Sequence, residues 1–337
     1  MQDLRNTKHQ LILVLLLGMA LLVWQSLGRD KLTVYCAHDA VFAESILRDF
    51  EKQTGIPVAI KFDTEATKSL GLAEQIIREA AHPRCDVFWN NELLGTLDLA
   101  ARGLLEPHKG TGWQRIPAQF RDADGRWTGF AARLRVIIQC NDGPELDDAW
   151  LLKGDLSRFA MAKPLYGTTL THYTVLWHEW GPERLKQWHA DTRRRGLREM
   201  PGNAQVKDMV ASGECDQGFT DTDDFFEAKD EGKPVTMRPA QLESGQTICI
   251  PNTVAIIRNA PHAENARKLA DFLLSAKTEL ALARSKSRQI PLGPVDATQL
   301  PQEVRDLLPH AARGYPLTDL LTARNECLAW LKGEYLK

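Results

Sequence analysis

Two long apolar stretches decide how this chain folds: residues 127–140, WTGFAARLRVIIQC, and residues 247–257, TICIPNTVAII. Each is typical of one long, buried strand. Between them we expect an alternating α/β unit with helices near residues 171–180, 182–195, 203–212 and 223–231. A chain that enters this middle unit by one strand and leaves it by another crosses twice between two lobes. The first lobe is therefore predicted to be discontinuous.

The segments on either side of the middle unit also alternate between strand and helix patterns. Short apolar runs predict strands at residues 32–35, 56–62 and 86–89. Apolar residues spaced by three and four predict a helix that contains Phe42, Ile46, Leu47 and Phe50 and ends at Gly55. Further helices are predicted at residues 70–80, 92–102, 263–275 and 278–283, with a Leu-rich helical tail from 301 to 336. Such alternation is the signature of a largely parallel sheet with helices on its faces.

Composition excludes several classes of protein. The 337 residues carry 42 Lys and Arg against 44 Asp and Glu, for a net charge of -2. This balance gives no electrostatic reason to expect a nucleic acid partner. With 43% hydrophobic residues, 23 Gly and 17 Pro, the chain has ample core for a globular fold of about two domains.

The amino end predicts export. Residues 11–24, LILVLLLGMALLVW, carry no charge and follow Arg5 and Lys8. This pattern is typical of a secretory signal, and it is shorter than the roughly 20 apolar residues of a comfortable membrane span. Because no clean cleavage site follows, residues 1–30 are predicted to be either a cleaved signal peptide or a retained membrane anchor. Either alternative places the rest of the chain outside the cytoplasm.

Six cysteines are too few and too scattered for a disulfide scaffold or a zinc site, and no two form a CxxC pair. Export would permit one or two disulfides. The alternative is buried thiols, since Cys36, Cys140 and Cys249 all lie in strand-like runs.

No catalytic residue is predicted, because the sequence contains no GxSxG, HExxH, GxGxxG or Walker A motif. The sharpest local feature is TDTDD at residues 220–224, which places Asp221, Asp223 and Asp224 within four residues. Carboxylates this close repel one another unless a cation or a donor compensates, and hard cations prefer oxygen ligands. Capping of the next helix is the alternative role, and both roles can hold.

Other polar residues sit where strands end and helices begin. The loop YGTTLTH at residues 166–172 leads into a helix and offers hydroxyls and backbone N–H groups to an anion. An ordinary helix cap is the alternative. His38 follows the first strand, and Asn203 is expected to cap a helix after Pro201 and Gly202.

Several segments together resemble the periplasmic solute-binding proteins of ABC transporters, and within them the ferric-ion-binding branch. They are LTVYCAH (32–38), FEKQTGIPV (50–58), CDVFW (85–89), GLLEP (103–107), RLRVII (133–138), VASGEC (210–215), IPNTVA (250–255) and SRQIPL (287–292). The resemblance spans about residues 31–292 and keeps the order of elements, although no single motif in it is highly specific.

The resemblance implies a two-lobed type II periplasmic binding protein fold that closes around a small ligand. Lobe 1 would comprise residues 31–133 and 253–300, lobe 2 residues 134–252, and residues 301–337 a helical tail packed on the lobes. It further implies a monomer that delivers its ligand to an ABC transporter permease in the membrane.

The resemblance also implies a site. The expected metal ligands are His38, Asp221, Asp223, Asp224 and Tyr166. The expected ligand-binding residues are His38, Asn91, Arg133, Tyr166, Gly167, Thr168, Thr169 and Asn203, and several of them would hold a carbonate or phosphate beside a ferric ion. Arginine suits such an anion because its guanidinium bonds two oxygens at once.

The sequence departs from the iron-binding pattern. Asp223 and Asp224 stand where the ferric-binding branch carries two adjacent tyrosines, and Asn91, beside Glu92, stands where it carries a glutamate. His38 is retained. The ligand is therefore predicted to be ferric iron, with another metal complex, an organic cation or a phosphorylated small molecule as alternatives. A membrane-tethered ligand sensor would share the same site.

Overall fold

A central mixed sheet organises the molecule. The structure, a computed structural model, describes residues 31–38, 40–63, 70–141 and 154–336. Its strands are β1 (Leu32–Cys36), β2 (Val58–Phe62), β3 (Val87–Asn90), β4 (Leu105–Glu106), β5 (Thr128–Cys140), β6 (Phe159–Ala162), β7 (Arg198–Met200), β8 (Gln217–Asp221), β9 (Val235–Pro239) and β10 (Cys249–Ile257). They follow the order β2-β1-β3-β10-β5-β8-β6-β7, with β4 beside β10 and β9 beside β5.

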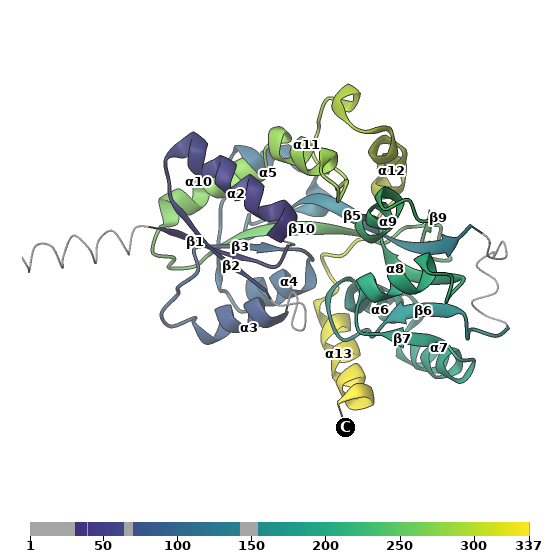
Figure 1. Cartoon of the computed structure of the whole chain (residues 1–337). Coiled ribbons are helices and arrows are strands. Elements are labelled where there is room, and N and C mark those ends of the chain that lie inside the picture. Colours follow the sequence, from purple (N-terminus) through teal and green to yellow (C-terminus); the bar gives the residue numbers. More distant parts are fainter. Residues whose placement is uncertain (1–30, 39, 64–69, 142–153, 337) are drawn as a thin grey trace, which may run out of the picture.

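The sheet has two halves that share one long strand. In the first half β1 runs parallel to β2 and β3, and β10 runs antiparallel to β3 and β5. Strand β5 pairs with β10 up to Leu134 and with β8 from Arg135 onward. Figure 1 shows β5 and β10 running between the two halves of the molecule. The two long strands that the sequence predicts are confirmed, and so is the α/β class.

Helices cover both faces of the sheet (Figure 1). They are α2 (Ala40–Thr54), α3 (Leu70–Arg78), α4 (Leu94–Ala101), α5 (Thr111–Arg115), α6 (Gly167–Trp180), α7 (Pro182–Arg194), α8 (Asn203–Ala211), α9 (Thr222–Asp230), α10 (Ala263–Leu273), α11 (Ala276–Arg284), α12 (Gln302–Ala312) and α13 (Leu321–Tyr335), with 3-10 turns at Ala118–Phe120 and Ala297–Gln299. In the first half α2, α10 and α11 lie on one face and α3 and α4 on the other. In the second half α8 and α9 face α6, α7 and α13 across the sheet.

The core consists of two main apolar layers, one on each side of the sheet. In β5, Val136 and Ile138 belong to the layer under α8 and α9, and Ile137 belongs to the layer under α6. This alternation follows from the two-residue period of a strand. Each layer extends through both halves, so the halves share a continuous core along β5 and β10.

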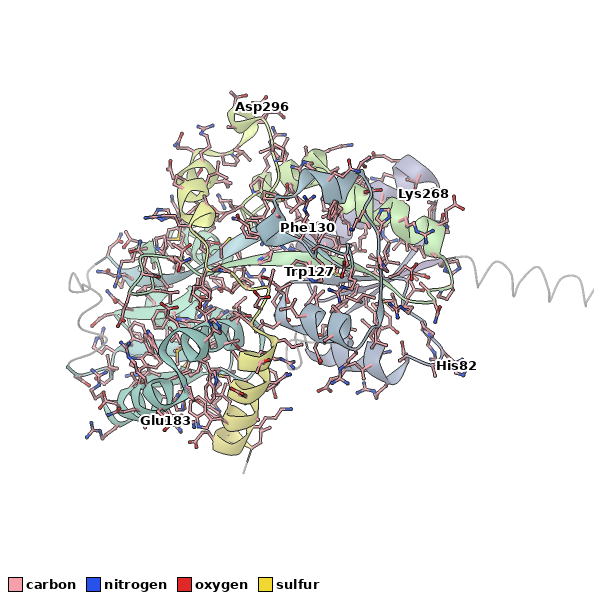
Figure 2. All side chains as sticks on the ribbon, turned by 180° about the vertical axis from the view of Figure 1, so that it is seen from behind. His82, Trp127, Phe130, Glu183, Lys268 and Asp296 are labelled. Atoms are coloured by element: carbon pink, nitrogen blue, oxygen red, sulfur yellow. The ribbon has the colours of Figure 1, made fainter. Side chains whose placement is uncertain are left out.

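A bulge interrupts β5 where the two halves meet. Ala131 has a φ of 43°, a conformation that strains a residue with a side chain. The buried carboxylate of Glu279 accepts the Ala131 N–H at 2.8 Å, and the next residue, Ala132, forms a bridge with Ile290. Figure 2 shows Trp127 and Phe130 in the middle of the molecule, close to this point. The Glu279 side chain and the main-chain bridge to Ile290 thus hold the bend in place.

The tail and the cysteines complete the fold. Helix α13 packs along α6, and its Arg324 lies 3.8 Å from Asp98 of α4, so it touches both halves. All six cysteines are free, five of them buried, which confirms the buried-thiol alternative. The apolar residues 11–24 lie outside the described residues, and no helix within the described part is long and apolar enough to cross a membrane.

Candidate functional site

Polar residues gather where the parallel strands of each half end. Strands β1 and β3 pair with Cys36 opposite Trp89, so His38 and Asn91 follow at the same edge of the first half. In the second half β8 ends at Asp221 and α9 begins at the next residue. Strand ends of this kind form the ligand sites of open α/β sheets.

The three aspartates predicted as metal ligands lie close together. Carboxylate oxygens of Asp221, Asp223 and Asp224 all lie within 4.8 Å of one another. Asp221 is the residue before α9, and Asp223 and Asp224 lie in the first turn of that helix. The helix begins at Thr222, as a cap at Asp221 would require, but the Asp221 side chain makes no capping hydrogen bond. The cap prediction is therefore wrong for this side chain, because stronger donors on neighbouring elements bind it.

Those donors enclose the Asp221 carboxylate. Arg135 Nη1 lies 2.7 Å from Oδ1, and Thr168 Oγ1 donates to Oδ2 at 2.6 Å. Asn203 Nδ2 donates to Oδ2 at 3.1 Å, and Arg133 Nε lies 3.4 Å from the same oxygen. Asp221 and Arg135 are both buried. The carboxylate is thereby a fixed part of the site.

Thr168, Thr169 and Asn203 form one polar network, as expected of neighbouring site residues. Asn203 Oδ1 accepts hydrogen bonds from Thr169 Oγ1 at 3.2 Å and from Arg135 Nη1 at 3.2 Å. The structure corrects two predictions here. The cap of α8 is Gly202 rather than Asn203, because the Asn203 side chain turns toward α6 and β8. Helix α6 begins at Gly167, so Thr168 and Thr169 lie in its first turn and not in a loop.

Arg133 connects the two halves of the site. Its Nη2 donates to the main-chain oxygen of Asn91 at 2.6 Å, and its Nε lies 4.0 Å from Asp223 as well as 3.4 Å from Asp221. The side chain is buried. A planar guanidinium with five donors can serve both partners at once. The predicted residues Asn91 and Arg133 therefore meet, but through the backbone of Asn91.

Asp224 has an unusual protonation equilibrium. Thr220 Oγ1 donates to its Oδ2 at 2.6 Å. Burial, followed by the charges of Asp223 and Asp221, raises the pKa of Asp224 to about 8. Desolvation and like charges both disfavour the ionised carboxylate. The raised pKa favours the protonated form of Asp224, and a cation that binds this carboxylate would displace the proton into solvent.

The remaining predicted residues are His38, Tyr166 and Gly167. The ring of His38 is buried and stacks on Trp89, with centroids 5.4 Å apart. Tyr166 is the N-cap residue of α6 and is 39% exposed. Gly167 opens that helix with a φ of 54°, a conformation that favours glycine. These residues lie at strand and helix ends, as the sequence predicts.

Two buried groups were not predicted. Arg135 is completely buried and binds Asp221, Thr168 and Asn203. The available signal was its spacing of two from Arg133, which places both arginines on one face of β5. Glu92 is the second group, because its carboxylate accepts the backbone N–H of Gly95 at 2.7 Å and so holds the start of α4.

Comparison with known proteins agrees with this architecture. The family of bacterial extracellular solute-binding proteins matches residues 32–285. Iron uptake protein A1 of Synechocystis sp. is 25% identical over 280 residues, which cover 76% of this chain and 74% of that protein.

Solved structures share the fold at low sequence identity. Iron-bound HitA from Pseudomonas aeruginosa has a TM-score of 0.77 at 22% identity, covering 90% of this chain and 98% of that one. A Trichodesmium protein (IdiA, FutA) in complex with iron and citrate has a TM-score of 0.72 at 17% identity, covering 90% and 98%. This likeness confirms the predicted two-lobed type II periplasmic binding protein fold. Because the family match extends over most of its length, the chain belongs to the bacterial extracellular solute-binding proteins.

Proposed function

We propose that this protein captures ferric iron between its two lobes, outside the cytoplasm, and delivers it to the permease of an ABC transporter. The observation that carries the proposal is the group of three carboxylates within 4.8 Å at the junction of β8 and α9. Relatives named for iron uptake and for ferric iron binding support it. In this role the protein binds and releases its solute as a monomer without turnover.

The chemistry of the site favours a hard cation. Asp223 and Asp224 supply carboxylate oxygens, which such cations prefer. Asp221 is held by Arg135, Thr168 and Asn203, so it stands behind the other two as a fixed negative charge. We assign His38 and Tyr166 as further ligands, because His38 follows the end of β1 and Tyr166 is the N-cap residue of α6.

We further propose that the lobes comprise residues 31–133 with 253–300 and residues 134–252, with residues 301–337 packed on both. The change of partner along β5, from β10 at Leu134 to β8 at Arg135, supports this division. A strand shared by two half-sheets is a suitable hinge. A solute closes such a hinge by binding the closed state more tightly than the open one.

Titration of the metal-free protein tests the ligand. Tryptophan fluorescence would be followed while ferric, ferrous and manganese salts and a polyamine are added separately. We expect ferric iron to bind most tightly, and Asp223→Ala plus Asp224→Ala to weaken it at least 100-fold. Asp230→Ala is the matched control, since it removes a carboxylate from the other end of α9, where it pairs with Arg288.

Each alternative ligand has its own result. Unchanged ferric affinity in the double variant would refute the site, and preference for the polyamine would favour an organic cation. A visible charge-transfer band that disappears in Tyr166→Phe would identify the phenolate ligand. For the amino end, mass spectrometry of the exported protein distinguishes a cleaved signal from a retained anchor at residues 11–24, which a tethered sensor would keep.

A further inference from the structure

We propose that Asp221 is a built-in anion: its carboxylate fills a cradle that would otherwise bind a small free oxyanion such as carbonate, formate or phosphate. The inference concerns the same site as the proposed function, and its consequence for solute binding rests on that function. It rests on the donors around Asp221, and these can be tested without any metal.

The donor set is that of an oxyanion site. Two guanidinium groups, one hydroxyl and one amide N–H converge on Asp221, at 2.7 Å from Arg135, 3.4 Å from Arg133, 2.6 Å from Thr168 and 3.1 Å from Asn203. They come from β5, from the first turn of α6 and from the first residue of α8. Proteins bind carboxylate and phosphate groups with charged and hydroxyl donors that point at two of the oxygens of the anion.

Burial makes an anion at this position necessary. Arg135 is 0% exposed, Asp221 3% and Thr168 5%. Within the described residues, Asp221 is the only acidic group in ion-pair distance of Arg135, and Arg135 Nε and Nη2 have no hydrogen-bond acceptor there. Removing the carboxylate would leave this buried guanidinium without its ion-pair partner, which is strongly unfavourable. An anion from solution would then be bound in its place.

Solute binding is affected because the Asp221 carboxylate already occupies the cradle. While Asp221 fills the cradle, a free carbonate or phosphate cannot accept the same hydrogen bonds from Thr168 and Asn203. The solute site therefore works independently of small oxyanions in the medium. The carbonate or phosphate expected from the sequence is replaced, at these donors, by a side chain of the protein itself.

Chemical rescue tests this assignment in the full exported chain. Thermal unfolding of wild type, Asp221→Ala, Asp221→Asn and Asp230→Ala would be measured in sodium formate, acetate and phosphate. Sodium chloride at equal ionic strength is the reference. Asp221→Ala opens space for an anion, and Asp221→Asn fills it with a neutral amide. Asp230→Ala removes a carboxylate that is paired with Arg288 in a more exposed position.

We expect the Tm of Asp221→Ala alone to rise, by roughly 5 °C or more at 100 mM formate or phosphate, because binding to the native state stabilises it. A flat response of Asp221→Ala to every anion would overturn the proposal, as would an equal response of wild type. If Asp221→Ala does not fold in chloride, its refolding from urea would be measured in each salt to test the proposal. Recovery with formate or phosphate supports the built-in anion, and equal failure in all salts refutes it. None of these results depends on whether the solute is iron.

Discussion

Arg133 donates a hydrogen bond from Nη2 to the main-chain oxygen of Asn91, which follows β3, at 2.6 Å. The same guanidinium lies 3.4 Å from Asp221 and 4.0 Å from Asp223, at the end of β8 and the start of α9 in the second half of the sheet. One buried side chain therefore holds together the edges at which the proposed solute ligands lie. Its position on β5, the strand common to both halves, makes this possible.

Replacing this arginine by lysine should loosen the contact between the two edges that it bridges, at Asn91 and at Asp221. Lysine keeps the charge but lacks the planar fork that reaches two partners. We expect Arg133→Lys to lose about 1–3 kcal/mol in free energy of unfolding and to increase the radius of gyration of the solute-free protein in small-angle X-ray scattering. Arg158→Lys is the control, because Arg158 bonds Asp216 and Gly213 within the second half. An unchanged radius for Arg133→Lys would contradict the bridging role.

Arg135 and Asp221 should depend on each other for stability. Either side chain alone would lose its shorter ion pair in a buried site, so Arg135→Met or Asp221→Asn should cost about 3–5 kcal/mol. The double variant removes both charges and should cost clearly less than the sum. Urea unfolding of the four proteins completes the double-mutant cycle. Additive losses would mean that the pair is not coupled.

Metal affinity should rise with pH through the ionisation of Asp224. Because the pKa of Asp224 is raised to about 8, a bound metal must displace its proton below that pH. Between pH 6 and 7 the ferric affinity of wild type, divided by that of Asp224→Asn, should increase about tenfold, and the increase should level off above pH 8. Competition against the same chelator measures both proteins, so the chelator's own titration cancels. A ratio that does not change with pH would exclude Asp224 as a ligand.

The stability of the protein should fall in mild acid because of His172. Burial, with a smaller effect of Arg135, lowers the pKa of His172 to about 3 from 6.5. The unfolded chain binds this proton below pH 6.5 and the folded chain only below about 3, so the free energy of unfolding decreases as the pH falls through that window. The loss should be about 2 kcal/mol between pH 7 and 5. His189, whose pKa is lowered to about 4, acts in the same direction.

Urea unfolding at several pH values measures how much His172 contributes to the pH dependence of stability. His172→Phe keeps a ring against Phe219, which the imidazole contacts edge-on at 4.9 Å, and should flatten the pH dependence. His82→Ala should leave it unchanged, because His82 is exposed at the edge of the molecule (Figure 2). A wild-type slope that persists in His172→Phe would assign the effect to other groups.

The sequence carries enough local information to predict most of the elements. The long strands at 128–140 and 249–257, and helices such as α2 and α10, follow from apolar spacing, because periods of 2 and 3.6 place side chains on one face. The short strands β6, β7, β8 and β9 were not assigned residue by residue. They are too short to show a period, and β7, β8 and β9 mix polar with apolar residues, so they also lack the continuous apolar run that marks β1 and β3.

The candidate site also has a part that the sequence predicts and a part that only the structure shows. The acidic run at 221–224, the polar start of α6 and Arg133 stand out as chemical types in the sequence, whereas Arg135 and the bonds around Asp221 do not. Sequence alone determined the fold class, the two crossings and the residue types at the strand ends, since these depend on local pattern. The tertiary structure alone decided that Asp221 binds Arg135, 86 residues away. Partners of a buried charge are chosen by packing, which brings distant elements together.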